Sequence, residues 1–330
     1  MDQIFDKLPG LEVPVSQISQ SLARMWQDTA AEGKAAPAAD EVKATQVNFI
    51  LHIGFGSNPE DALKQFANTV DFSSRYPSRV VVLCPRHPDT VGHAEMRAKI
   101  YGECFLGKSK GDSRCCEFVI LSYSMAARPF LESQVSICLL ADLPVYYWLH
   151  RFRSCQRIAD YKYLLRHCQR LLVDMATAPE DALDFPWPNP AGLRDLAYAR
   201  ALPIRQSIGL FLSRYDSHAL SHGLKRVTIS YEEVHLAEGR ALLRWAKERL
   251  ADCGAVMKDV EWTEEVLPYK AGVCFGLSFF YRGEKQFAWR GNCDSGVAHF
   301  CANFGNGYTE MPAHIALLNP AQALSEAMFF

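Results

Sequence analysis

The sequence lacks the cysteine spacing that marks many small metal and redox sites. It contains eleven cysteines in 330 residues, yet none are arranged as C-x-x-C, the spacing typical of zinc knuckles and thioredoxin-type dithiols. We therefore expect a protein that is not an enzyme and that has no cofactor and no metal site.

Strong net charge and long hydrophobic runs are absent as well. The 35 Lys and Arg residues nearly balance 37 Asp and Glu residues, so no global field attracts nucleic acid or an anionic membrane. The longest apolar run, Val135 to Leu149, is interrupted by Asp142 and Pro144 and falls short of the roughly 18 residues that span a bilayer. We expect no membrane partner, and nucleic acid is disfavoured.

The amino terminus and the cysteines indicate the compartment. The chain begins Met1-Asp2-Gln3 without a basic stretch and an apolar core, which argues against a secretory peptide. Cys138 and Cys274 lie in apolar runs, where a thiol behaves as a small hydrophobe. A cytoplasmic, reducing location is the simplest expectation.

Periodicity and composition divide the chain into four segments. Residues 1–43 form a helix and a linker that can dock in cis or on a partner, and residues 44–178 alternate apolar strands with amphipathic helices around a turn at Gly107 to Asp112. Residues 179–202 are a proline-rich connection, and residues 203–330 combine helices with strand-like runs. The predicted fold class is α/β, with an N-terminal mixed-sheet α/β domain plus a smaller α+β C-terminal domain with antiparallel strands.

A glycine-containing loop connects a predicted strand to a predicted helix. His52 to Pro59 reads H-I-G-F-G-S-N-P, a context in which dinucleotide-binding proteins hold a phosphate. Pro59, however, stands where such loops carry a third glycine. Asn58 as N-cap and the acidic Glu60 and Asp61 in the first turn make a good helix start without a ligand. We favour this structural interpretation.

Arg79 begins an otherwise aliphatic predicted strand. An arginine there can pair with a carboxylate, and Asp142 or Asp174, both near strand ends, can accept it. We favour such an ion pair over a ligand site, since ion-pair networks also hold strand ends in register. Glu117, in the next predicted strand, is a further candidate for a polar contact.

Aromatic residues precede a basic turn at Arg151 and Arg153. These residue types are enriched where binding energy concentrates at protein interfaces. For the basic residues from Arg157 to Arg170, a solvated helix face is favoured over a nucleic-acid surface. His218 and His222 are four residues apart but lack further ligands nearby, so we predict no metal site there.

Several short motifs occur in one order along the chain. They read Y-P-S-R-V-V-V-L at Tyr76 to Leu83, R-C-C-E at Arg114 to Glu117, A-D-L-P-V-Y-Y-W at Ala141 to Trp148, and L-L-V-D at Leu171 to Asp174. This series resembles the glucose-6-phosphate dehydrogenase assembly protein family, OpcA, in which "PSR" plus aliphatics precedes "CCE", "DLP" plus aromatics, and a short strand ending in Asp. Asp195 to Arg205 looks like the family's "DLSW-x-R-L-x-P-W-R" stretch.

The resemblance implies an allosteric activator in the oxidative pentose phosphate pathway. It implies a non-catalytic accessory protein that binds glucose-6-phosphate dehydrogenase and promotes its assembly into an active oligomer. We place the partner-binding surface on the exposed parts of Tyr147, Trp148, Arg151 and Arg153.

Two further groups of residues are assigned with this resemblance in view. Some family members are regarded as links between redox state and dehydrogenase activity, which makes Cys115 and Cys116 redox candidates. The favoured alternative is that both cysteines are small hydrophobic residues packed in a sheet, because free Cys is among the most buried residue types. Five charged residues are assigned to a structural polar network: Arg79, Glu117, Asp142, Asp174 and Arg205.

The rival interpretation is an enzyme. An α/β protein can bind a sugar phosphate or a nucleotide at the carboxyl ends of its strands, and Arg79, Glu117 and Asp142 would then converge in a pocket.

Overall fold

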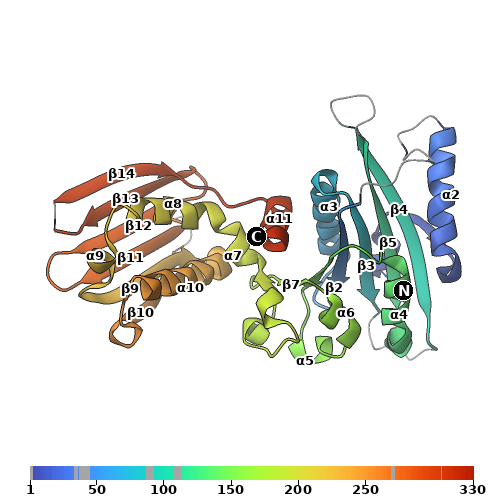
Figure 1. Cartoon of the computed structure of the whole chain (residues 1–330), viewed down its shortest axis with the longest axis horizontal. Helices are drawn as coiled ribbons and strands as arrows, with labels where there is room; N and C mark the ends of the chain where they lie inside the picture. Colours follow the sequence, from blue (N-terminus) through green and yellow to red (C-terminus); the bar gives the residue numbers. More distant parts are fainter. Residues whose placement is uncertain are drawn as a thin grey trace. The chain divides into compact units, whose positions relative to one another are not determined.

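The computed structural model describes residues 3–32, 36, 45–86, 93–106, 113–268, 272–305 and 307–330 (Figure 1). Its internal contacts separate two compact units, Met1–Asp195 with Leu324–Phe330, and Leu196–Ala323. The first contains a mixed eight-stranded sheet and the second a six-stranded, mainly antiparallel sheet. The predicted fold class is confirmed. The predicted turn at Gly107 to Asp112 lies outside the described residues.

The first sheet has a doubly wound core. Six strands, β5-β3-β2-β6-β7-β8, run parallel to one another. Numbered by their order in the chain, they lie across the sheet in the order 3-2-1-4-5-6, as in dinucleotide-binding folds. β4 and β1 extend the sheet in antiparallel fashion. The eight strands are β1 (Leu11–Val13), β2 (Val47–Ile53), β3 (Ser78–Pro85), β4 (Met96–Leu106), β5 (Ser113–Tyr123), β6 (Val145–His150), β7 (Arg170–Val173) and β8 (Leu193–Asp195).

Helices cover both faces of this sheet. On one face α3 buries Phe66 and Phe72 against Phe49 and Phe118. The other face packs Ile50, among others, against the buried residues of α2, α4 and α6. The helices are α1 (Gln3–Lys7), η1 (Val15–Gln17), α2 (Ile18–Ala31), α3 (Pro59–Arg75), η2 (Met125–Ala127), α4 (Arg128–Cys138), α5 (Cys155–Ile158), α6 (Lys162–His167), η3 (Glu180–Leu183) and η4 (Pro190–Gly192). The central strands are therefore buried on both sides, as their continuous aliphatic sequence predicts.

The amino-terminal segment docks in cis on the first sheet. β1 pairs with β4, and α2 also contacts β4. The buried Lys99 ammonium donates hydrogen bonds to the carbonyls of Phe5 (2.7 Å) and Leu8 (2.8 Å), which fixes α1. Residues 3–32 are thus part of the first unit. Most of the predicted linker, residues 33–35 and 37–43, lies outside the described residues.

The second unit is an antiparallel sheet with helices on it. The strand order is β10-β9-β11-β12-β13-β14, in which the β10–β9 pair is parallel and the other four pairs are antiparallel. Helices α8 and α10 lie along one face of the sheet (Figure 1), and their apolar residues share one buried cluster with it. The elements are α7 (Leu196–Arg200), α8 (Leu202–Leu212), α9 (Ser217–Ser221), β9 (Leu224–Glu232), η5 (Glu233–His235), α10 (Leu236–Asp252), η6 (Met257–Asp259), β10 (Glu261–Leu267), β11 (Phe275–Tyr281), β12 (Gln286–Asn292), β13 (Val297–Asn303), β14 (Tyr308–His314) and α11 (Pro320–Phe329).

The division between the units falls at Asp195, inside the predicted connection 179–202. The carboxyl end of α11 belongs to the first unit, where the Phe329 ring packs on Tyr76 and Tyr146. Among the described helices, none combines the length and apolar character needed to cross a membrane.

Candidate functional site

The predicted ion pair of Arg79 exists, but its partner is Glu117. The two residues are register neighbours on the parallel strands β3 and β5, and the guanidinium donates to the carboxylate. Arg79 also donates to the Cys138 carbonyl (3.0 Å), and the Trp26 indole donates to Glu117 (2.6 Å). This cluster ties α2, β3, β5 and α4 together at the amino ends of the parallel strands.

The other members of the predicted polar network do not join this cluster. Asp142 is exposed in the turn before β6, so the expectation that it accepts Arg79 is wrong. Asp174 instead accepts the backbone N–H of Ala176. Arg205 lies in the second unit, where its guanidinium covers the Tyr198 ring at 3.7 Å. The rival prediction that Arg79, Glu117 and Asp142 form a ligand pocket at the carboxyl ends of the strands is likewise wrong.

Half of the predicted partner-binding surface is buried. Tyr147 and Trp148 lie on β6, which is flanked by β2 and β7 and covered on both faces, so neither side chain can contribute to a surface. Arg151 and Arg153 follow the strand, and Arg153 is exposed. Arg151 pairs with Asp61 (3.0 Å) and has a positive φ of 48°.

The loop after β2 is structural. The N–H groups of Gly54 and Gly56 donate to the carbonyls of His150 (2.7 Å) and Arg151 (3.1 Å), so they are not available for a phosphate. A Cβ on Gly54 would lie 2.4 Å from the Arg151 carbonyl oxygen, which explains the glycine. The Asp61 carboxylate, held by His150 at 2.7 Å, occupies the helix start, where a phosphate would otherwise be stabilised.

A second glycine pattern lies partly outside the described residues, which end at Leu106 before this gap. Residues 102–109 read G-x-x-x-x-G-K-S, the spacing of a phosphate-binding loop, which requires a strand, a loop and a helix. Here Gly102 lies within strand β4, and a Cβ on it would come within 2.7 Å of the Trp26 ring. Gly102 therefore makes room for the indole that binds Glu117.

The cysteines of the R-C-C-E motif differ from each other. Cys115 forms a disulfide with Cys104 across the β4–β5 pair, so the favoured interpretation of two unpaired small hydrophobes is wrong for Cys115. Cys116 is buried, and burial raises the pKa of its thiol to about 12. A thiol of that pKa is a poor nucleophile at neutral pH.

A cleft of about 800 Å³ opens at the carboxyl ends of the parallel strands. Its walls come from segments after β2, β3, β5 and β6, including Phe55, Pro85, Met125 and Phe152. In doubly wound sheets this position, where the strand order reverses between β2 and β6, is the usual location of a ligand crevice. We call it the switch-point cleft.

Three guanidinium groups line the switch-point cleft. Arg128 pairs with Asp160 (2.8 Å) and lies over the Tyr161 ring at 5.1 Å. Arg153 and Arg157 are exposed and have no ion-pair partner among the residues that the structure describes. The cleft is therefore basic, and it suits an anionic ligand or an acidic protein surface. Arg128 and Arg157 were not predicted as site residues, because they come together only through the fold.

A chain of buried hydrogen bonds supports the inner wall of this cleft, to which His52 and Tyr161 contribute. His52 hydrogen-bonds with the hydroxyls of Tyr147 (2.7 Å) and Tyr123 (2.9 Å), and Tyr123 hydrogen-bonds with Tyr161 (2.8 Å). Burial lowers the pKa of His52 to about 3 and raises the pKa of Tyr123 well above its usual value. All of these groups are neutral at pH 7, which suits a rigid wall better than acid–base catalysis.

An exposed apolar stripe runs along α4, which begins at the cleft with Arg128 and ends at Cys138 near Arg79. Phe130 and Ile137, seven residues apart and hence on one helical face, are 66% and 67% exposed. Met125, at the start of the same segment, lines the cleft. Exposed large apolar side chains and arginines are both typical of protein interfaces.

Comparisons with known proteins give a family match within the first unit. Residues 69–185 match the OpcA family model, described as glucose-6-phosphate dehydrogenase subunit N-terminal domain. A protein of Nostoc punctiforme named as an OxPP cycle protein OpcA is 26% identical over 189 residues, which are 54% of this chain and 39% of that protein. The chain thus spans less than half the length of this relative.

A solved structure of the transcriptional regulator Gal80p from Kluyveromyces lactis aligns with 92% of this chain and 84% of its own, at 10% identity and a TM-score of 0.42. A similarity this low carries no argument about function.

Proposed function

We propose that this chain, whose residues 69–185 belong to the OpcA family, is a non-catalytic accessory protein that binds glucose-6-phosphate dehydrogenase and promotes its assembly into an active oligomer. The observation that carries the proposal is the family match. The matched segment contains α4 and the three arginines of the switch-point cleft, so it includes all the residues of the interface proposed below.

The proposed interface combines the basic cleft rim with the α4 stripe. Arg153 and Arg157 meet acidic groups of the dehydrogenase, and Phe130 and Ile137 bury apolar area against it. To act as an activator, the protein must bind the active oligomer more tightly than the inactive form, since a ligand shifts an equilibrium only by its differential affinity. In the proposed interface, Phe130 and Ile137 of α4 supply the apolar contacts that the sequence assigned to Tyr147 and Trp148, which are buried.

Charge reversal tests the cleft rim. In the variant Arg153→Glu/Arg157→Glu, we expect association with the cognate dehydrogenase to weaken by at least tenfold, because removing and inverting charge at a desolvated contact costs about 2 kcal/mol or more. The measurements are the sedimentation mass and the activity of the dehydrogenase at several concentrations of this protein. Phe130→Ser/Ile137→Ser tests the stripe separately in the same assays.

Arg166→Glu is the matched control, since Arg166 is an exposed arginine on α6 outside the cleft, and it should behave like the unmodified protein. Binding and activation by both double variants at unmodified strength would contradict the proposed surface.

Repeating the assays under reducing and oxidising conditions tests redox sensitivity, for which the Cys104–Cys115 disulfide is the candidate in place of Cys116.

A second candidate function is binding of a phosphorylated small molecule in the switch-point cleft. It is favoured by the position of the cleft and by its guanidinium groups. If it holds, sugar phosphates or nucleotides at a hundred times their Kd should stabilise the protein by about 2.7 kcal/mol without any partner, and Arg153→Gln/Arg157→Gln should abolish the shift in unfolding temperature. No shift with any such ligand would reject this function and leave the accessory role.

A further inference from the structure

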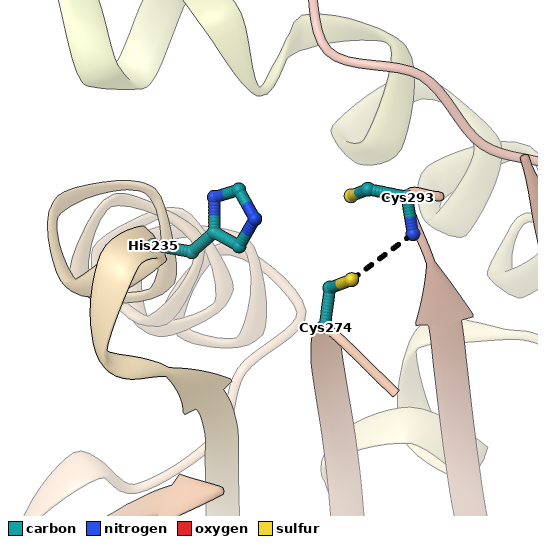
Figure 2. A group of neighbouring side chains, drawn as sticks. All are labelled: His235, Cys274 and Cys293. Atoms are coloured by element: carbon teal, nitrogen blue, oxygen red, sulfur yellow. Dashed lines mark hydrogen bonds between the residues drawn. The ribbon is translucent and has the colours of Figure 1, made fainter. Parts of the chain in front are cut away.

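Three potential metal ligands converge in the second unit. The ligand atoms of His235, Cys274 and Cys293 all lie within 4.8 Å of one another, and Figure 2 shows the imidazole facing the two thiols. Cys274 is buried, and the other two are partly buried. No sequence motif signals this cluster, because the three residues are far apart in the chain.

The strand topology explains why they meet. β9 and β12 both pair antiparallel to β11, so the end of β9, the start of β11 and the end of β12 lie at the same end of the sheet. His235 closes η5 directly after β9, Cys274 precedes β11, and Cys293 follows β12. Each ligand therefore comes from a different one of three neighbouring strands.

The backbone around the cluster is fixed independently of any ion. The Cys274 N–H donates to the Gly291 carbonyl (2.8 Å), and its carbonyl accepts the Glu232 N–H (3.0 Å). The Cys293 N–H donates to the Cys274 sulfur (3.2 Å), a contact that also supports a thiolate. The cluster thus lies at the ends of three strands, on backbone that hydrogen bonds hold in place.

The turn after β12 is fixed as well. The Asn292 side chain accepts the N–H groups of Asp294 (2.9 Å) and Ser295 (3.0 Å) and donates to the Gly272 carbonyl (3.0 Å). On the opposite side, the His235 ring packs on Phe275 with 4.8 Å between centroids. These contacts limit where the Cys293 and His235 side chains can go.

We propose that His235, Cys274 and Cys293 bind one Zn²⁺ ion, with water or another group as the fourth ligand. Thiolates and imidazole are the donors that zinc prefers, and Zn–S bonds of about 2.3 Å in a tetrahedral site place two sulfurs about 3.8 Å apart. The cluster needs a contraction of at most about 1 Å to reach that geometry. The ion would join β9 and η5 to β11 and β12 and stabilise the second unit.

The test uses the full chain, reduced and freed of metal with a chelator. Titration with Co²⁺ should produce a thiolate-to-cobalt charge-transfer band that saturates at one ion per chain and disappears when Zn²⁺ is added. Cys274→Ser, Cys293→Ser and His235→Gln should each weaken metal binding by more than about 100-fold. Losing a residue that only supports a ligand costs up to about 100-fold, and losing the ligand itself should cost more. Zn²⁺ should raise the unfolding temperature of the unmodified protein but not of these variants.

Cys301→Ser and His222→Gln are the matched controls, since both residues lie in the second unit outside the cluster, and both should bind like the unmodified chain. Circular dichroism of the metal-free variants establishes that they fold. Absence of stoichiometric binding, or binding that survives in the Cys274→Ser and Cys293→Ser variants, would overturn the proposal. A Cys274–Cys293 disulfide found by peptide mapping of the protein as purified, before any reduction, would also overturn it.

Discussion

Replacing Glu117 by alanine is expected to destabilise the first unit by about 3–5 kcal/mol, the cost of removing one partner from a buried ion pair. The Glu117 and Arg79 side chains are only 5% and 15% exposed. In the variant, the Arg79 guanidinium keeps the Cys138 carbonyl but loses its counter-charge, and the Trp26 indole N–H loses its acceptor. Unfolding in urea, followed by tryptophan fluorescence, measures the change.

Two comparisons separate the causes of this loss. Glu117→Gln keeps an acceptor for Trp26 while removing the charge, so it should cost less than alanine. The exposed pair Arg86–Glu95 is the matched control, because Glu95 is 55% exposed, and Glu95→Ala should cost less than about 1 kcal/mol. An effect of Glu117→Ala no larger than that of Glu95→Ala would show that the cluster does not hold α2, β3 and β5 together.

The sequence predicts the strands and helices of the first unit better than it predicts which of their residues lie next to one another in the fold. Apolar periodicity is sufficient to recognise β2, α3 and β3, because buried parallel strands are continuously aliphatic. The acid that pairs with Arg79 could not be chosen, since Glu117 becomes its neighbour only when β5 is placed beside β3. The disulfide of Cys115 was missed for a related reason: it depends on the register of β4 against β5.

The errors about the surface have a similar origin. Tyr147 and Trp148 look like interface residues in the sequence, but β6 occupies the middle of the sheet, which buries both. The edge strands β10 and β14 were not predicted, since both are largely exposed and their sequences lack a clean apolar alternation. The switch-point cleft and the His235 cluster are assembled from separate loops, and no spacing in the sequence announces either.

His52 is expected to make the first unit sensitive to acid. Its pKa is lowered to about 3 by burial, whereas in the unfolded chain an imidazole titrates near 6.5. Below pH 6.5 the unfolded chain therefore binds a proton that the folded protein does not, so the free energy of unfolding falls as the pH falls. The slope for one proton is about 1.4 kcal/mol per pH unit, which amounts to about 2 kcal/mol between pH 7 and pH 5.

His52→Gln removes this titration while leaving a polar side chain between Tyr147 and Tyr123. We expect the variant to be less stable than the unmodified protein at pH 7, because the two hydroxyls lose a well-placed partner. At pH 5 this difference in the free energy of unfolding should be smaller by about 2 kcal/mol, since only the unmodified protein is destabilised by the titration of His52. His150 and Asp61, whose pKa values are also lowered, titrate in both proteins and cancel in the difference. If the difference in stability between the two proteins is the same at pH 7 and pH 5, His52 accepts a proton in the folded protein as readily as in the unfolded chain. The inner wall of the cleft would then carry a positive charge at pH 5.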